Sequence, residues 1–208
     1  MKAIEIILMG GLLTVAASGY AQKSKPCKSD KFDGYGYSTA TGKTKPGQLF
    51  LIKDGEIHLK GKQVGYLMTR RTYGDFELTA QFRWADEQED RTSSKRNSGI
   101  MFRVPETASD TLWPKGFQYQ IKDNATGDFV LLQQVTVEVN DLVCGPGASV
   151  SVKRMVDAEK AAGEWNEIRI IAKGDAIEQY LNGVLVNKGR KGVGRQRAYF
   201  ISVRRVSD

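Results

Sequence analysis

The sequence predicts an all-β fold in which two antiparallel sheets pack face to face. Apolar and polar residues alternate along several segments, most clearly in DFELTAQFRW (75–84), and this is the period of a strand with one buried face. Turn signals such as Asn182-Gly183 separate these segments. Helical periodicity is nearly absent, and only residues 156–164 are predicted to form one short helical turn. Many short strands, each with one polar face, are typical of a β-sandwich.

Taken in chain order, the other strand predictions rest on the same alternation. The segments EIHLKG (56–61) and GFQYQIKD (116–123) each place apolar residues on one side and polar residues on the other. Segment 166–186 contains two turn signals and is therefore predicted to form three strands. The mixed-charge run 85–96 has no apolar period, so we expect a solvated loop between two strands.

The N-terminus has the features of a secretory signal peptide. Lys2 precedes an apolar stretch that ends near Ala17, and small residues precede a cleavage point after Ala21. The apolar stretch is shorter than the roughly 20 residues of a membrane helix. We therefore expect residues 1–21 to be removed and residues 22–208 to form a single domain, secreted or periplasmic and without a membrane span.

The two cysteines of the chain, Cys27 and Cys144, are candidates for a disulfide bond. Export to an oxidising compartment would allow this bond to form and to tie the mature N-terminus to the middle of the chain. Two separate thiols remain the alternative.

The formal net charge of +7 is concentrated at the C-terminus. Only Asp208 opposes the basic residues there, which are Lys188, Arg190, Lys191, Arg195, Arg197, Arg204 and Arg205. The rest of the chain is close to neutral, and a basic tail alone is a weak indication of polyanion binding. We therefore predict no nucleic-acid partner.

A series of sequence blocks stands in a characteristic order. The blocks are KFDGYG (31–36), DGEIHLKG (54–61), GYLMTRRTYGDFELTAQFRW (65–84), RNSGIMFR (96–103), GFQYQIKDNATGD (116–128) and GEWNEIRIIAKGDAIEQYLNGVLV (163–186). Together they span about residues 31–188 and resemble the 3-keto-disaccharide hydrolase family of exported bacterial proteins. The resemblance implies a concanavalin A-like jelly roll, a carbohydrate partner and a site on the concave polar face of a sheet.

The chain departs from this family at two places. Members commonly carry a glutamate where this chain has Gln118, and an amide does not transfer protons at neutral pH. The family-like ending is absent or altered after about residue 188. This difference predicts a sandwich that lacks its usual last strand and exposes a sheet edge.

We predict a sugar-binding surface built from polar residues on strand faces. Arg103 would present planar donors to hydroxyl or carboxylate groups, and Asn97 would bond hydroxyls. The alternatives are that Asn97 caps a turn and that Arg103 pairs with a structural acid. Trp113, in a proline-containing loop, would line the rim. The predicted binding residues are Arg83, Asn97, Arg103, Gln118, Gln120 and Trp113.

Three residues are candidates for the chemistry, namely Asp123, Glu77 and His58. The usual route of glycoside hydrolysis needs two carboxyl groups about 5–9.5 Å apart, and the sequence pairs no two of them. The resemblance implies another route, because a ketone at C3 of a sugar acidifies the C2 proton so that a base can remove it. His58 is a candidate base or metal ligand, so a divalent metal is a candidate cofactor.

The main functional prediction is an exported carbohydrate-active protein that acts as a glycosyl hydrolase on disaccharides or 3-keto-glycosides. A non-catalytic carbohydrate-binding module is the first alternative. A polyanion- or protein-binding domain that uses the basic C-terminal tail is the second. The sequence predicts neither the sugar nor the oligomeric state.

Overall fold

The structure is a computed structural model. It describes the backbone of residues 4–7, 14–17, 20–23, 34–53, 56–59, 64–70, 72–84, 96–190 and 199–204, and the side chains of most residues between 34 and 190. The described structure consists of strands, turns and one short helix, α1 (Pro46–Leu49). None of the helical structure in these ranges is long and apolar enough to cross a membrane.

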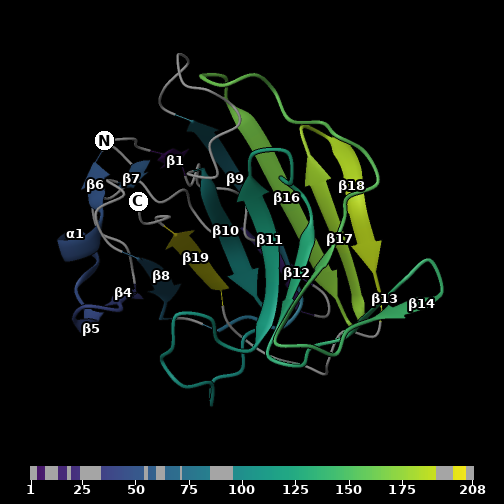
Figure 1. Ribbon diagram of the computed structural model, residues 1–208, viewed down its shortest axis with the longest axis horizontal. Coiled ribbons are helices and arrows are strands. Elements are labelled where there is room, and N and C mark those ends of the chain that lie inside the picture. Colours follow the sequence, from purple (N-terminus) through teal and green to yellow (C-terminus); the bar gives the residue numbers. More distant parts are fainter. Residues whose placement is uncertain are drawn as a thin grey trace.

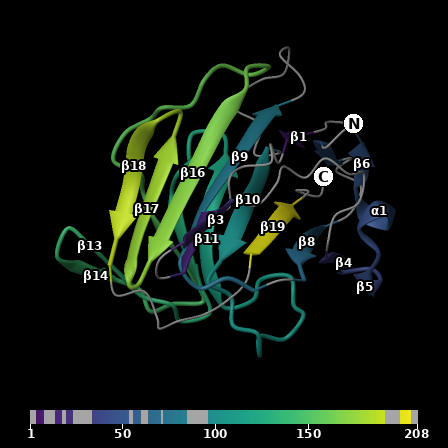
Figure 2. The ribbon, with the colours of Figure 1, turned by 180° about the vertical axis from the view of Figure 1, so that it is seen from behind.

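Two antiparallel sheets form the layers of a sandwich (Figure 1, Figure 2). The seven-stranded sheet has, in order, β18 (Val184–Gly189), β17 (Ala176–Leu181), β16 (Asn166–Lys173), β9 (Phe76–Trp84), β1 (Ile4–Ile7), β7 (Glu56–Leu59) and β6 (Leu51–Lys53). The eight-stranded sheet has β15 (Ser149–Val152), β12 (Phe129–Leu132), β11 (Gly116–Lys122), β10 (Asn97–Phe102), β19 (Tyr199–Arg204), β8 (Gly65–Thr69), β4 (Gly34–Ser38) and β5 (Gly42–Thr44). Two separate ribbons pair β13 (Val137–Val139) with β14 (Leu142–Cys144) and β2 (Thr14–Ala17) with β3 (Tyr20–Lys23).

The chain passes repeatedly from one sheet to the other. It leaves the eight-stranded sheet after β8, returns at β10, leaves again after β15 and returns at β19. These crossings place strands that are distant in sequence side by side, as in the β9–β16 and β10–β19 pairs. The topology confirms the predicted all-β jelly-roll sandwich of two antiparallel sheets.

The core lies between the two sheets and contains the apolar residues of the alternating segments. Phe82 of β9, Tyr119 of β11 and Ile170 of β16 are each 0% exposed. The rings of Phe102 and Phe117 stack with centroids 5.7 Å apart, which joins β10 to β11 within the core. The predicted alternation is therefore confirmed. The predicted helical turn at 156–164 is wrong, because that stretch is irregular apart from isolated bends and one turn at 162–163.

Both ends of the chain contribute strands within the sheets. β1 pairs with β9 and β7, so cleavage after Ala21, which remains a prediction, would remove a strand from the seven-stranded sheet. β19 pairs with β10 and β8 inside the eight-stranded sheet. The predicted open sheet edge is therefore wrong, because β19 fills the position between β10 and β8. The predicted loop 85–96 lies outside the described residues except for Arg96.

Candidate functional site

The outer face of the eight-stranded sheet, opposite the core, brings together predicted binding residues. Residues directly opposite each other on antiparallel strands share a face. Two rows cross the sheet on either side of β19, with Gln118–Met101 and Met68–Tyr35 in one row and Gln120–Gly99 and Tyr66–Tyr37 in the other. Asn97 lies on the same face, two residues before Gly99 on β10. The structure therefore places Asn97, Gln118 and Gln120 together on one face, and their role in binding stays a prediction.

Three amide side chains form a hydrogen-bonded chain on this face. The Nε2 atom of Gln118 donates to Oε1 of Gln120, and Nε2 of Gln120 donates to Oδ1 of Asn97 at 3.3 Å. Gln118 is 4% exposed, whereas Asn97 and Gln120 are half-buried. The solvent-facing end of the chain can therefore bond hydroxyl groups as donor and as acceptor.

Gly99 is required by the position of Gln118. A Cβ atom on Gly99 would lie 2.5 Å from Nε2 and 2.7 Å from Cδ of Gln118. The Gln118 side chain therefore crosses the strand over the glycine. In RNSGIMFR (96–103), Gly99 makes room for the side chain of Gln118 on the neighbouring strand, and Asn97 lies beside this amide on the same face.

A tyrosine–aspartate cluster lies at the β4–β8 side of the same face. The hydroxyls of Tyr35 and Tyr66 both donate to Oδ1 of Asp110, at 2.8 Å and 3.3 Å. Asp110 is exposed and belongs to the loop between β10 and β11. Burial raises the pKa of both phenols, and the Asp110 carboxylate raises them further. Both hydroxyls therefore stay protonated at neutral pH and act as donors.

An apolar cluster covers the sheet between these polar groups. Tyr66 and Met101 are 0% exposed, and the half-buried Trp113 packs against the cluster. The backbone carbonyl of Trp113 accepts a hydrogen bond from Gln133 at 3.3 Å. Trp113 thus lies on the predicted face, where part of its indole surface remains exposed.

Two arginines predicted for this face lie elsewhere. Arg103 follows β10 with a φ of 52°, is 4% exposed, and donates to the backbone oxygen of Gly174 in the turn between β16 and β17. The left-handed backbone turns the side chain toward the other sheet. Arg83 lies on β9, with its guanidinium 4.7 Å from the centre of the Trp165 ring. The prediction that both line the site with Gln118 is wrong.

The three predicted catalytic residues occupy separate places. Glu77, on the outer face of the seven-stranded sheet, accepts a hydrogen bond from Nε of Arg169 at 2.5 Å. His58 lies on β7, with Nε2 3.3 Å from a Glu56 oxygen. Asp123 follows β11 and lies 3.7 Å from Arg96. The structure therefore assembles no catalytic group from these residues.

Asp123 lines a small cavity of about 90 Å³ that also contains Glu159 and Trp84. The Trp84 indole donates to Oε1 of Glu159 at 3.0 Å. Burial nevertheless raises the pKa of Glu159, which lies opposite the Asp123 carboxylate. The cavity is smaller than the roughly 300 Å³ at which ligand pockets begin, so it does not hold a sugar ring as it stands.

The predicted disulfide and metal centre receive no direct support. Cys27 lies outside the described residues, so the bond to Cys144 stays a prediction. The thiol of Cys144 lies 3.9 Å from the carbonyl oxygen of Leu142. Within the described ranges, no three histidine, cysteine or acidic side chains converge to hold a metal ion.

Sequence reasoning missed Tyr35, Tyr66, Asp110 and Glu159 as site residues. The alternation of Tyr35 and Tyr37 in the segment 34–38 indicates that both face one side of a strand. No local pattern indicates the contact with Asp110, because 75 positions separate it from Tyr35.

Comparison with known proteins identifies the family of this β-sandwich. Residues 28–201 match the 3-keto-alpha-glucoside-1,2-lyase-like domain, so the chain belongs to this family, as the sequence blocks predicted. A solved structure of a candidate glycosyl hydrolase from Parabacteroides distasonis is 14% identical with a TM-score of 0.49, covering 85% of this chain and 91% of that one. The carbohydrate-binding module CBM66 from Bacillus subtilis is 14% identical with a TM-score of 0.41, covering 69% and 83%. No curated protein matches the sequence.

Proposed function

We propose that the protein binds a 3-keto-glycoside on the outer face of the eight-stranded sheet and cleaves it by elimination. The observation that carries the proposal is the presence on one face of an amide chain, which suits sugar hydroxyls, and a carboxylate bonded to two phenols. Family membership supports the same chemistry. The predicted secreted or periplasmic location would give the protein access to such glycans.

The amide chain would bind and orient the sugar. Asn97 and Gln120 are half-buried and lie at the open end of the chain, where each can bond a hydroxyl as donor and acceptor. Gln118 holds Gln120 in place from beneath. Trp113 would contact an apolar face of the ring.

Asp110 would act as the base. Both tyrosine hydroxyls bond its Oδ1 atom, which leaves Oδ2 to take the C2 proton. The electrons of the C2–H bond form an enolate with the C3 oxygen. When the C3 carbonyl re-forms, a C1–C2 double bond forms and the C1–O bond breaks. The leaving oxygen then takes a proton from the Asp110 carboxyl group, and water can add to the product afterwards.

The two phenols would stabilise negative charge during this step. Burial keeps Tyr35 and Tyr66 protonated. The half-buried Tyr35 can therefore move its hydrogen bond from Asp110 to the enolate oxygen as the carboxylate becomes neutral, while the fully buried Tyr66 keeps its bond to Asp110. A hydrogen-bond donor would then face the C3 oxygen, on which the negative charge of the enolate develops.

A chromogenic 3-keto-α-glucoside tests the proposal. The purified chain is incubated with this substrate and with the unoxidised glucoside, in the presence of a divalent metal and in the presence of a chelator. We expect aglycone release from the keto substrate only. Asp110→Asn should lower kcat by about 100-fold or more, and Gln120→Ala should raise KM about tenfold.

Asp175→Asn is the matched control, because Asp175 is an exposed aspartate in the turn between β16 and β17. It should retain full turnover. Equal turnover by Asp110→Asn and the control would refute Asp110 as the base.

A non-catalytic carbohydrate-binding module is the second candidate. The observation that favours it is Gln118, because an amide at this place cannot transfer a proton. Saturable glycan binding that is lost in Gln120→Ala, without turnover of any keto substrate, would establish this alternative.

A further inference from the structure

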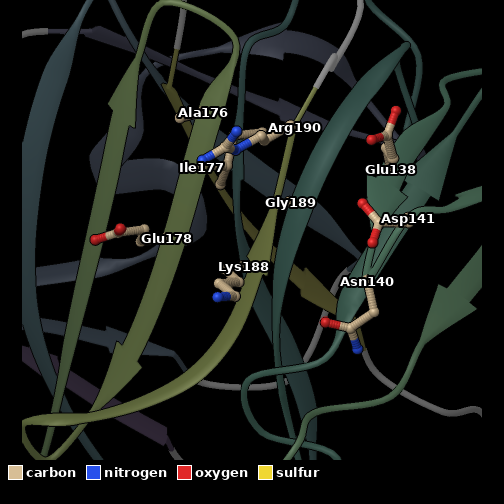
Figure 3. Close-up of a pocket in the computed structure, with 9 residues that line it drawn as sticks. All are labelled: Glu138, Asn140, Asp141, Ala176, Ile177, Glu178, Lys188, Gly189 and Arg190. Atoms are coloured by element: carbon tan, nitrogen blue, oxygen red, sulfur yellow. The ribbon is translucent and has the colours of Figure 1, made fainter.

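A second pocket lies at the far edge of the seven-stranded sheet, between the β13–β14 hairpin and the strands β17 and β18 (Figure 3). Its volume is about 450 Å³, which lies in the range of roughly 300–1,000 Å³ found for ligand sites. Its polar and charged lining residues are Glu138, Asn140, Asp141, Glu178, Lys188 and Arg190. None of them belongs to the outer face of the eight-stranded sheet.

The backbone fixes the two walls of this pocket relative to each other. Glu138 and Arg190 exchange two backbone hydrogen bonds of 2.9 Å each, which attach β13 to the end of β18. Gly189 allows this close approach, since a Cβ there would lie 2.4 Å from Cγ2 of Val137. Main-chain contacts therefore hold the two walls of the pocket together.

The hairpin turn places its polar side chains on one wall. Asn140 and Asp141 have φ values of 49° and 62°, as in the tight turns of two-residue hairpins. Figure 3 shows Glu138, Asn140 and Asp141 on the hairpin side, and Lys188 and Arg190 on the strand side. The hairpin wall thus carries carboxylates and an amide. The strand wall carries two cations together with Glu178, whose carboxylate accepts a hydrogen bond from the Tyr180 hydroxyl at 2.7 Å.

Three of the charged side chains that line the pocket form no bond to one another. Within the described part of the chain, the side chains of Asp141, Lys188 and Arg190 take part in no hydrogen bond or ion pair. Lys188, Arg190 and Asp141 are all exposed, so a ligand can reach them.

The separation of charge selects the ligand class. A polyanion would meet the carboxylates of the hairpin wall, and a metal cation would meet Lys188 and Arg190. A ligand with a carboxylate at one end and hydroxyl donors at the other satisfies both walls, because guanidinium and ammonium groups bind carboxylates while carboxylate and amide oxygens accept from hydroxyls.

We propose that this pocket binds a sugar acid, such as a uronic acid residue of a glycan, independently of the site on the eight-stranded sheet. Lys188 and Arg190 contact the carboxylate of the ligand. Asp141 and Asn140 contact its hydroxyls. The pocket would hold an acidic glycan at the β18 edge of the molecule, far from β4 and β8 (Figure 1). The proposal concerns binding only and involves no catalytic step.

NMR or calorimetric titration of the full chain with sodium glucuronate tests the proposal, with methyl glucoside and sodium acetate as comparison ligands. We expect saturable glucuronate binding that is at least about tenfold tighter than that of either comparison ligand and weakens with added salt. Arg190→Ala and Asp141→Asn should each weaken glucuronate binding about tenfold.

Lys160→Ala is the charge-matched control. Lys160 is an exposed lysine whose ammonium group donates to the Trp165 carbonyl, just before β16 begins, whereas the pocket lies near the end of β16. Glucuronate binding should be unchanged in this variant. Equal affinity for acetate, or binding that survives both Arg190→Ala and Asp141→Asn, would overturn the proposal. Loss of 3-keto-glucoside turnover in Asp110→Asn is a separate result, so the two proposals fail independently.

Discussion

Replacing Gln179 with methionine should stabilise the protein, because this buried amide has no hydrogen-bond partner among the residues that the structure describes. Gln179 lies on β17 between the core residues Ile177 and Leu181 and is 0% exposed. Neither Nε2 nor Oε1 bonds to any described group. The neighbouring Asn187 uses its Nδ2 atom to bond the carbonyl oxygens of residues 152 and 153 instead.

The expected gain follows from the cost of burying an unpaired polar group. That cost is about 1–3 kcal/mol, and methionine fills nearly the same shape as glutamine. Gln179→Met should therefore raise the free energy of unfolding by about 1–3 kcal/mol. In a domain of this size, the melting temperature should rise by roughly 2–12 °C.

Thermal unfolding followed by circular dichroism measures this change. Gln81→Met is the control, because Gln81 is a half-buried glutamine on the outer face of β9 in the same sheet. Its effect should stay within about 0.5 kcal/mol. An unchanged or lower melting temperature for Gln179→Met would refute the reasoning, since it would show that the amide has a favourable partner, such as a buried water, in the folded protein.

Two further predictions concern Glu159 and Gly99. Burial raises the pKa of Glu159, so stability should fall as the pH rises from the ordinary glutamate pKa to the raised one, and Glu159→Gln should flatten that part of the profile. Urea unfolding at several pH values measures this, and an unchanged slope would contradict it. Gly99→Ala should displace the Gln118 amide and cost roughly 1–3 kcal/mol of stability. Adding Gln118→Ala should restore part of the loss, whereas purely additive effects in the same urea experiment would exclude a clash between the two residues.

The strands and part of the binding face follow from local sequence patterns. Gln118 and Gln120 are two positions apart on a strand, so they share a face in any sheet. The antiparallel pairing of neighbouring strands then brings Asn97 to that face. The strand period and the connection between successive strands are therefore enough to predict that these three residues share a face.

The rest of the site depends on geometry that no local pattern contains. Alternation predicts Arg103 on the outer face, but the positive φ at this residue reverses the direction of its side chain. Arg83 and Glu77 do lie on a polar strand face, but it belongs to the other sheet, and only the strand order decides this. Asp110 reaches Tyr35 through loop folding across a long sequence separation.

The glutamine at position 118 has a structural explanation that moves the chemistry elsewhere on the face. Gln118 is 4% exposed, lies over Gly99 and donates to Gln120. A glutamate there would lose this donor and place a charge in a buried position, which is costly without a cationic partner. The amide therefore suits a residue that supports the binding face. A base for the proposed reaction must then reach the face from outside the sheet, as Asp110 does from the loop between β10 and β11.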